Sequence, residues 1–147
     1  TLGLKNIVLA APMNFGEGKN ERGKLHTDPM MADPRYFNYN HFMMSQFAYP
    51  DLAVIDGFVG MEGQGPLYGD PIDVGVAIAS TDCIAADRIG TDVMGQDFNE
   101  VGHLVHCANT HMGVGDITKI NLLGDKVATC KKDFKKHDAY DKIIRWK

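Results

Sequence analysis

The stretch Leu52-Ala-Val-Ile-Asp-Gly-Phe-Val-Gly-Met-Glu-Gly-Gln-Gly-Pro66 decides how the rest of the chain is interpreted. It opens with an apolar run, residues 52–55, whose side chains suit a buried and pleated surface. Asp56 ends that run, and glycines then recur every two or three residues. The pattern predicts a buried strand that opens into a glycine-rich loop at its carboxyl end. Open α/β sheets bind their ligands at that edge.

The predicted loop carries two carboxylates, Asp56 and Glu62. Two carboxyl groups in different surroundings can titrate apart, so that one serves as an acid and the other as a base. Gly63 and Gly65 would let the backbone approach a ligand closely and offer amides to an oxyanion or phosphate. We therefore expect the functional site here. The alternative is that both carboxylates only cap helices and glycine turns.

The composition is that of a globular domain. The chain has 147 residues, of which 44% are hydrophobic and 23% charged, and this size suits one hydrophobic core. A net charge of −4 gives no indication of binding to nucleic acid or to a membrane surface. No apolar run approaches the roughly 20 residues that a membrane-spanning helix needs. The three cysteines, Cys83, Cys107 and Cys130, lie too far apart for a paired metal or redox motif, so we interpret them as small buried thiols.

The chain divides by charge near its end. Residues 131–147 hold seven basic and three acidic side chains, together with enough apolar surface to form a docking helix. We expect residues 1–130 to form the α/β domain and residues 131–147 to form a basic tail. A tail of mixed sign usually covers a surface and rarely binds a polyanion.

Hydrophobic periodicity predicts the remaining elements. Residues 2–11 fit a buried strand or a helix equally well, and residues 12–32 form a long loop that is either functional or a surface segment. Asp33-Pro34 is a good helix start, and the aromatic and methionine side chains of that helix, which runs to about Ala48, are expected in the core. Further elements are predicted as a turn at 68–71, a buried strand at 73–80, helices at 83–94 and 99–112, and a hairpin at 117–130.

Two aspartates belong to the helix predicted at 83–94, one just before its first residue and one within it. Asp82 stands at its start, and a role as helix N-cap explains that residue fully. Asp87 lies at the edge of the apolar arc, where a half-buried carboxylate needs a partner. Because both follow the second predicted strand, they are also candidates to line the ligand site.

The helix predicted at 99–112 carries His103, His106, Cys107 and His111. Imidazole and thiolate suit zinc or iron. However, a straight helix places His103 and His106 on its polar face and Cys107 and His111 on the border of that face. All four side chains therefore cannot converge on one ion. This argues against a metal cluster here.

Several of these segments resemble a known family. Leu4-Lys-Asn6, the stretch 51–66, Ala79-Ser-Thr-Asp-Cys-Ile-Ala-Ala-Asp87 and Met94-Gly95 are similar to the family catalogued as domain of unknown function 362, over about residues 4–124. The resemblance implies an α/β fold of bacterial or archaeal type, and many members carry a ferredoxin-type iron–sulfur domain elsewhere in the chain. Members usually have an upstream segment with a Lys-Thr-His motif, so we expect this chain to lack an N-terminal part of the family domain. It has no ferredoxin cysteine cluster, so no iron–sulfur cluster is expected in this chain.

The resemblance also adds candidate site residues. Lys5, Asn6 and His26 match family positions and would supply a cation, an amide and a proton carrier. A divalent metal held by Asp56, Glu62 and Asp87 is a further hypothesis, because sites made only of carboxylates suit magnesium, calcium or manganese. The family has no established activity, so the resemblance implies no reaction.

These observations lead to one functional hypothesis and one rival. The leading hypothesis is an enzymatic α/β domain of redox-associated metabolism that binds a small molecule or anion, with Asp56, Glu62 and His26 as catalytic residues. The rival is a non-catalytic subunit or scaffold that docks an iron–sulfur or other redox protein. A cytoplasmic location is favoured, although some members of the resembling family are exported.

Overall fold

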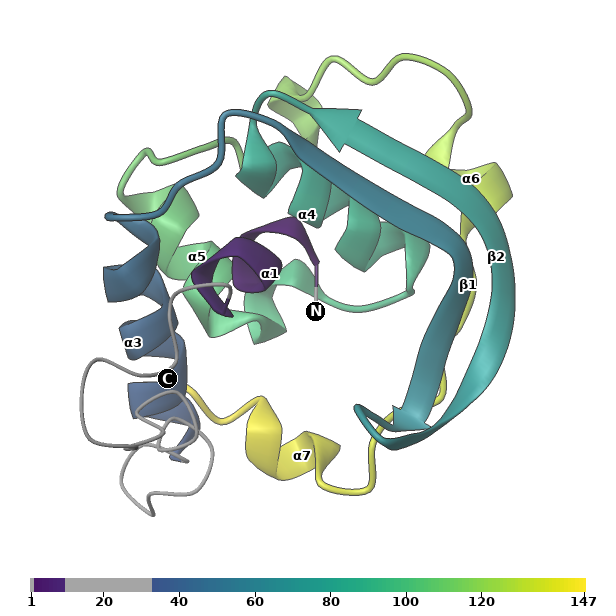
Figure 1. Ribbon diagram of the computed structural model, residues 1–147, viewed down its shortest axis with the longest axis horizontal. Coiled ribbons are helices and arrows are strands. Elements are labelled where there is room, and N and C mark those ends of the chain that lie inside the picture. The colour runs from purple at the N-terminus through teal and green to yellow at the C-terminus, as the bar shows by residue number, and fades with distance from the viewer. Residues whose placement is uncertain (1, 10–32) are drawn as a thin grey trace, which may run out of the picture.

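The computed structural model describes residues 2–9 and 33–147, in which helices flank a two-stranded antiparallel sheet (Figure 1). The strands are β1, Ala53–Gln64, and β2, Tyr68–Ser80. The helices are α1 (Gly3–Leu9), α3 (Pro34–Ser45), α4 (Cys83–Val93), α5 (Gly102–Asn109), α6 (Val127–Cys130) and α7 (Tyr140–Ile143), with short 3-10 helices η1 (Phe98–Glu100) and η2 (Ile117–Lys119). The expected class, a single α/β domain with flanking helices, is confirmed.

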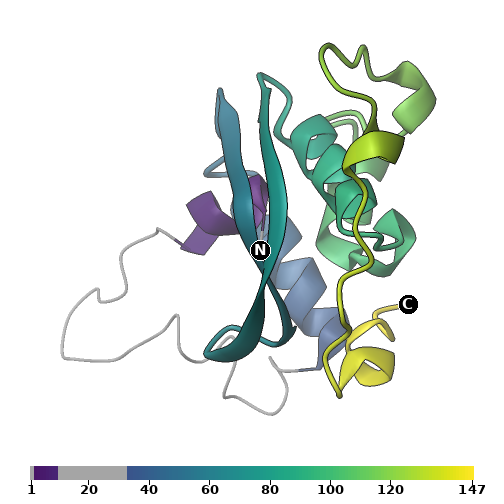
Figure 2. The same ribbon diagram turned by 90° about the vertical axis from the view of Figure 1, so that its right-hand side faces the viewer.

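The two strands form a long curved ribbon, with α4, α5, α6 and α7 on one side of it (Figure 2). The register pairs Ala53 with Ser80 and Glu62 with Asp70, with a bulge between Gly57 and Val59. The predicted glycine loop is therefore wrong, because β1 continues through those glycines to Gln64. Gly60 has a packing reason to be small, since a Cβ there would lie 2.7 Å from the ring of Phe134. The turn predicted at residues 68–71 is likewise part of β2.

Helix α4 lies at the centre of the core, as its apolar arc predicts. Asp82 caps it by accepting a hydrogen bond from the amide of Ala85 at 2.9 Å. The buried core cluster consists of Leu4, Ala53, Cys83, Ile84, Ala86, Phe98, Leu104 and Cys107. It joins α1, β1, α4, η1 and α5, and α1 contacts α3, α4 and β1.

Helix α3 begins where the sequence predicts, with Asp33 as N-cap, and Phe42 packs against the core, but the most deeply buried residues of the helix are not the predicted ones. Its buried residues are Asn38, His41 and Ser45, which form the polar stripe. The aromatic and methionine side chains Tyr36, Tyr39, Met43 and Phe47 are exposed. The polar stripe can face inward because its groups have partners. The Ser45 hydroxyl donates to the carbonyl of Phe42 and lies 3.4 Å from Cys107 Sγ.

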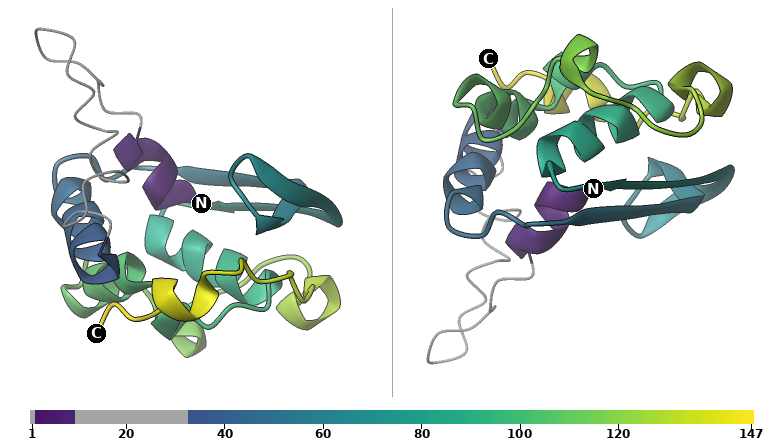
Figure 3. Two further views of the ribbon diagram at one scale, coloured as in Figure 1. Left: turned by 90° about the horizontal axis from the view of Figure 1, so that it is seen from below. Right: turned by 90° about the horizontal axis from the view of Figure 1, so that it is seen from above.

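The region after α5 differs most from prediction. The hairpin expected at 117–130 is wrong, since that segment contains η2, an extended stretch and α6. The tail lies on the same side of the ribbon as α4 and α5 (Figure 3), and it is largely non-helical, with α7 covering only Tyr140–Ile143. It is anchored by backbone hydrogen bonds from Lys132 to Val93 and from Phe134 to Met94.

Two further predictions concern the loop at residues 12–32 and the absence of a membrane-spanning helix. The long loop predicted at residues 12–32, with His26, lies outside the described residues. Within residues 2–9 and 33–147, no helix has the length and hydropathy required to span a bilayer.

Candidate functional site

The structure separates the two carboxylates that sequence analysis places in one site. Asp56 and Glu62 lie six positions apart on the same strand, which corresponds to roughly 20 Å of extended chain. Asp56 is exposed, and its Oδ1 accepts a hydrogen bond from the amide of Phe58 at 3.0 Å, within the bulge. Its contact is therefore local, and the expected pairing of Asp56 with Glu62 is wrong.

Glu62 instead holds the C-terminal tail against the ribbon. Its Oε2 accepts a hydrogen bond from the backbone amide of Lys135 at 2.8 Å. Next to it, the Gly63 amide donates to the Lys135 carbonyl at 2.9 Å, so the Gly63 amide is already engaged and not free for an oxyanion. These bonds give Glu62 and Gly63 a structural role.

The proposed carboxylate metal site is not assembled either. In an antiparallel ribbon the end of β1 lies at the opposite end from the end of β2, so Glu62 is remote from the start of α4. Asp87 is buried on α4, away from both ribbon carboxylates. In the part of the chain that the structure describes, no group of three or more His, Cys, Asp or Glu side chains could hold a metal ion. The three-carboxylate site is therefore wrong, and the same finding speaks against the histidine cluster of α5.

Three more candidates have clear positions outside a shared site. Asp82 is a structural hub, since its Oδ1 caps α4 and its Oδ2 accepts from the amide of Val114 at 2.8 Å. Asn6 is exposed on α1, and Gly65 lies in the link between the two strands. None of the three lines the cavity described next.

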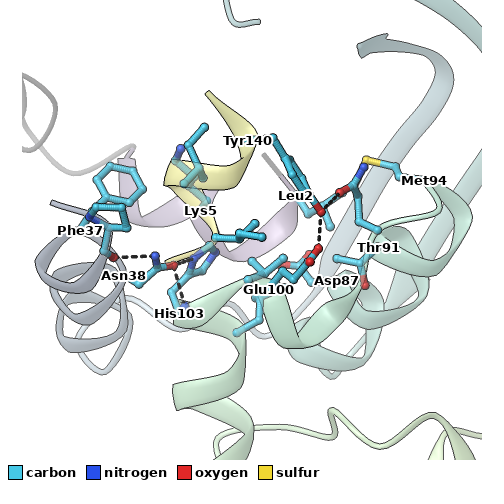
Figure 4. A pocket seen from close by; sticks show the side chains of 16 residues that line it. Leu2, Lys5, Phe37, Asn38, Asp87, Thr91, Met94, Glu100, His103 and Tyr140 are labelled. Carbon is cyan, nitrogen blue, oxygen red and sulfur yellow. Dashed lines mark hydrogen bonds between the residues drawn. The ribbon is translucent and has the colours of Figure 1, made fainter. Parts of the chain in front are cut away.

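A cavity of about 460 Å³ brings together the remaining candidates, Lys5 and Asp87. It opens between α1, α3, α4, α5 and α7, and most of its wall is apolar, from residues such as Leu2, Phe37 and Leu104. Its polar lining comprises Lys5, Asn38, Asp87, Thr91, Gln96, Glu100, His103 and Tyr140. Figure 4 shows Lys5, Phe37, Asn38 and His103 toward one end of it and Asp87, Thr91 and Met94 toward the other.

Asp87 is buried, with 1% of its surface exposed, and it binds the start of α1. Its two carboxylate oxygens accept hydrogen bonds from the amides of Gly3 at 2.6 Å and Leu4 at 3.0 Å. Burial raises the pKa of Asp87 to about 6, although these two hydrogen bonds act in the opposite direction. The partner that the sequence requires for this carboxylate is therefore a helix N-terminus.

Lys5 lies in the first turn of α1, lines the same cavity and is the cation of the site. Its Nζ is 5.0 Å from the centroid of the Phe37 ring, a cation–π contact. Within the described residues no carboxylate lies within ion-pair distance of Lys5. Burial lowers the pKa of Lys5, because an ammonium group is poorly solvated there.

His103, which the sequence places on a polar face, is buried and fixed by Asn38. The Asn38 side-chain amide donates to the Pro34 carbonyl at 2.7 Å, so its Oδ1 faces His103. That oxygen accepts from the His103 backbone amide at 2.9 Å and contacts ring Nδ1 at 3.0 Å. Nδ1 therefore carries the ring proton. Burial lowers the pKa of His103 to about 3, with smaller contributions from His41 and Lys5, so the ring is neutral at neutral pH.

The C-terminal tail closes another part of the wall. The Tyr140 hydroxyl hydrogen-bonds to Glu100 and, at 3.0 Å, to Gln96. Burial and the Glu100 carboxylate raise the pKa of Tyr140. The Trp146 indole donates to the Asn99 carbonyl at 3.2 Å and packs edge-on against His106. The tail thus contributes directly to the cavity.

This arrangement suits a small organic ligand. The wall is apolar, and its few polar groups include a half-buried amine, a carboxyl group and a neutral imidazole, which is the usual make-up of a ligand pocket. Sequence reasoning found Lys5 and Asp87, considered His103 only as a metal ligand on a polar face, and missed Glu100 and Tyr140. These residues lie 95 to 135 positions away from Lys5 in the sequence, and no local pattern links them.

Comparison with known proteins agrees with the sequence motifs. Residues 1–92 match the family described as a domain of unknown function (DUF362). The "Thylakoid-associated protein sll1697" of Synechocystis sp. (strain ATCC 27184 / PCC 6803 / Kazusa) is 30% identical over 105 residues, covering 66% of this chain. The chain spans 28% of the length of that relative. No solved structure matches. Since the family match extends over more than half of the chain, and includes Lys5 and Asp87, the chain belongs to the DUF362 family.

Proposed function

We propose that this chain is a small-ligand-binding, enzymatic domain whose site is the cavity between α1, α4, α5 and α7. One observation carries the proposal: Lys5 lines a mostly apolar cavity without a carboxylate partner among the described residues. Lys5 is half-buried, and an amine that loses part of its solvation without gaining a counter-charge is costly, so its presence favours a role in binding or catalysis.

The lining supports a small molecule with an apolar body and a polar oxygen-bearing group. Leu2, Phe37, Val101 and Ile144 would contact the body. Lys5 would bind the polar group through its Nζ, and the neutral His103 would provide a hydrogen-bonding neighbour. The volume of about 460 Å³ is in the ordinary range for small-ligand pockets. The link to redox-associated metabolism rests on the family resemblance.

Ligand-observed NMR with a panel of small carboxylates, aldehydes and ketones tests this proposal. Binding should weaken in Ile143→Trp, because the indole would fill the cavity beside α7, and should be unchanged in Leu123→Trp, on the exposed segment 120–125. If panel members bind equally well to both variants, the cavity is not the ligand site.

A second candidate, docking of a redox partner protein, is favoured by the surface of the ribbon. Residues 53–80 include the carboxylates Asp56, Glu62, Asp70 and Asp73 and no lysine or arginine. Large apolar side chains are exposed on the same ribbon, including Val54, Phe58 and Met61. An acidic surface with exposed apolar groups suits a basic partner surface. Because the chain spans 28% of its relative, further segments of such a protein are also candidate partners.

Affinity capture with the tagged chain tests this second candidate. A partner that uses the ribbon should be captured by the wild type and lost in Val54→Asp, while Leu123→Asp retains it. Capture that is the same for all three proteins contradicts docking on the ribbon.

A further inference from the structure

We propose that the Lys5 amine forms a reversible Schiff base with the carbonyl carbon of a small aldehyde or ketone bound in the cavity. This inference rests on the cavity being the ligand site and adds the ligand's reactive group and the residue that reacts with it. Nothing in the family match assigns such a reaction.

The position of Lys5 is the first argument. Lys5 lines the cavity from α1, and its Nζ lies over the face of Phe37, 5.0 Å from the ring centroid. Asn38 and the buried His103 line the same end of the cavity as Lys5 (Figure 4). A lysine that only stabilises a fold usually extends to solvent or pairs with a carboxylate. Lys5 is instead half-buried in the cavity wall, and no carboxylate among the described residues pairs with it.

The chemical state of Lys5 is the second argument. An amine attacks a carbonyl only in its neutral form, and lysines become nucleophiles when an apolar pocket desolvates them. Burial lowers the pKa of Lys5, and no described carboxylate raises it again. His103 adds no positive charge at neutral pH, since its own pKa is lowered to about 3. The cavity therefore increases the neutral fraction of this amine relative to a surface lysine.

The reaction balances without an outside reagent. The nitrogen lone pair forms a bond to the carbonyl carbon as the carbon–oxygen π pair moves to oxygen. The two protons of the neutral amine pass to that oxygen, which leaves as water when the carbon–nitrogen double bond forms. The apolar wall would hold the carbonyl's organic substituent and limit the water available for hydrolysis.

Reductive trapping tests the proposal on the wild-type chain. The protein is incubated with butanal or pyruvate and sodium cyanoborohydride, with butyrate as a probe without an aldehyde or ketone, and labelled lysines are located by peptide mass spectrometry. Lys5 should be labelled several-fold faster than the exposed Lys126, because burial lowers the pKa of Lys5 and so increases its neutral fraction, and because the cavity holds the carbonyl compound beside it. Lys5→Met should lose that label, and Lys126→Met should retain it.

The outcomes separate this inference from the proposed function. Labelling of Lys5 at the same rate as Lys126, or only at surface lysines, overturns the Schiff base. If butyrate or pyruvate still binds in the cavity by NMR, as judged by its loss in Ile143→Trp, the ligand site survives and only the covalent step fails. If no probe binds and Lys5 is not labelled preferentially, both proposals fail.

Discussion

Asp87 shows how one buried side chain can join two parts of the fold. It lies on α4, yet both of its hydrogen bonds go to amides of α1, 83 and 84 positions away. The positive end of a helix dipole favours a carboxylate there. Desolvation is nevertheless the larger effect, because the pKa of Asp87 is raised to about 6.

This shift predicts an unusual pH dependence of stability. A carboxyl group whose folded pKa is about 6 and whose unfolded pKa is near 3.9 binds more protons when folded, so its contribution to the free energy of unfolding falls as pH rises from about 4 to 6. The loss is about 2–3 kcal/mol by pH 7. Urea unfolding of the wild type at pH 4–8, compared with Asp87→Asn, measures it.

Asp87→Asn should flatten this part of the profile while lowering stability at every pH, because the two amides of α1 bind different carboxylate oxygens and an Asn side chain has a single acceptor oxygen. Asp125→Asn, at an exposed position, is the control and should follow the wild type. A wild-type profile that rises from pH 4 to 6 as steeply as that of Asp87→Asn would contradict the prediction.

Asn38 is the second residue on which the cavity depends. Its side chain makes three hydrogen bonds, to the Pro34 carbonyl and to two nitrogens of His103. Asn38→Leu should lower the free energy of unfolding by about 2–4 kcal/mol, because buried donors lose their acceptor. It should also lower the pKa of His103 further, because the charged ring loses the acceptor of its Nδ1 proton, and NMR titration of the ring protons measures this. Asn109→Leu, at an exposed site at the end of α5, should leave both unchanged.

At the scale of elements, the burial of α3 departs from its sequence pattern although the helix itself is predicted. Its start follows from Asp33-Pro34, because capping is a local effect. Its orientation depends on α5, which offers Asn38 and Ser45 hydrogen-bond partners and so allows polar groups to be buried. A hydrophobic wheel has no information about such partners.

The orientation of α3 can be tested by a pair of substitutions. Phe47, which is 90% exposed, should tolerate Phe47→Ser with a change below about 0.5 kcal/mol in the free energy of unfolding. Ser45, with no exposed surface, should not tolerate Ser45→Leu, which adds volume to the core and removes a hydrogen bond. The expected loss is about 2–4 kcal/mol. If chemical denaturation shows that Phe47→Ser destabilises the protein more than Ser45→Leu, the aromatic side chains of this segment are in the core and the orientation described here is wrong.

The ribbon gives a second lesson at this scale. The residues of β1 and β2 predict two neighbouring strands, and both are present. The apolar pattern does not reveal whether the two strands run parallel or antiparallel. A site at which the carboxyl ends of both strands meet would require parallel strands, so the pattern alone does not support it. The short link at 65–67 makes the pair antiparallel, which separates Glu62 from Asp82 and Asp87.

At the scale of the whole molecule, local signals were predictable and long-range assembly was not. The family, the α/β class, α4 and the caps Asp33 and Asp82 follow from residues that are close in sequence. The cavity is lined by Lys5, His103 and Tyr140, which are distant in sequence. Only the packing of these segments against one another brings the three residues together. The sequence indicates Lys5 and Asp87 as candidates, but Asp56 and Glu62, which were expected to share a metal ion with Asp87, lie elsewhere.

The uncovered ribbon face predicts how the chain behaves in solution. Val54, Phe58, Val59 and Met61 are each more than half exposed along one strand, and long apolar strands promote association of like molecules. The ribbon's carboxylates oppose this through like-charge repulsion. Sedimentation velocity should therefore show reversible self-association that strengthens with salt, since salt screens the repulsion.

Substitutions on the ribbon distinguish association through this face from association through other exposed apolar side chains. Val54→Lys with Met61→Lys should keep the chain monomeric in high salt, because both side chains lie on the exposed strand face and their removal takes away apolar surface. Leu122→Lys with Leu123→Lys, on the exposed segment beyond η2, is the matched control and should associate like the wild type. Equal association of all three proteins would place the self-contact elsewhere, while association that weakens with salt would indicate that charge attraction drives it.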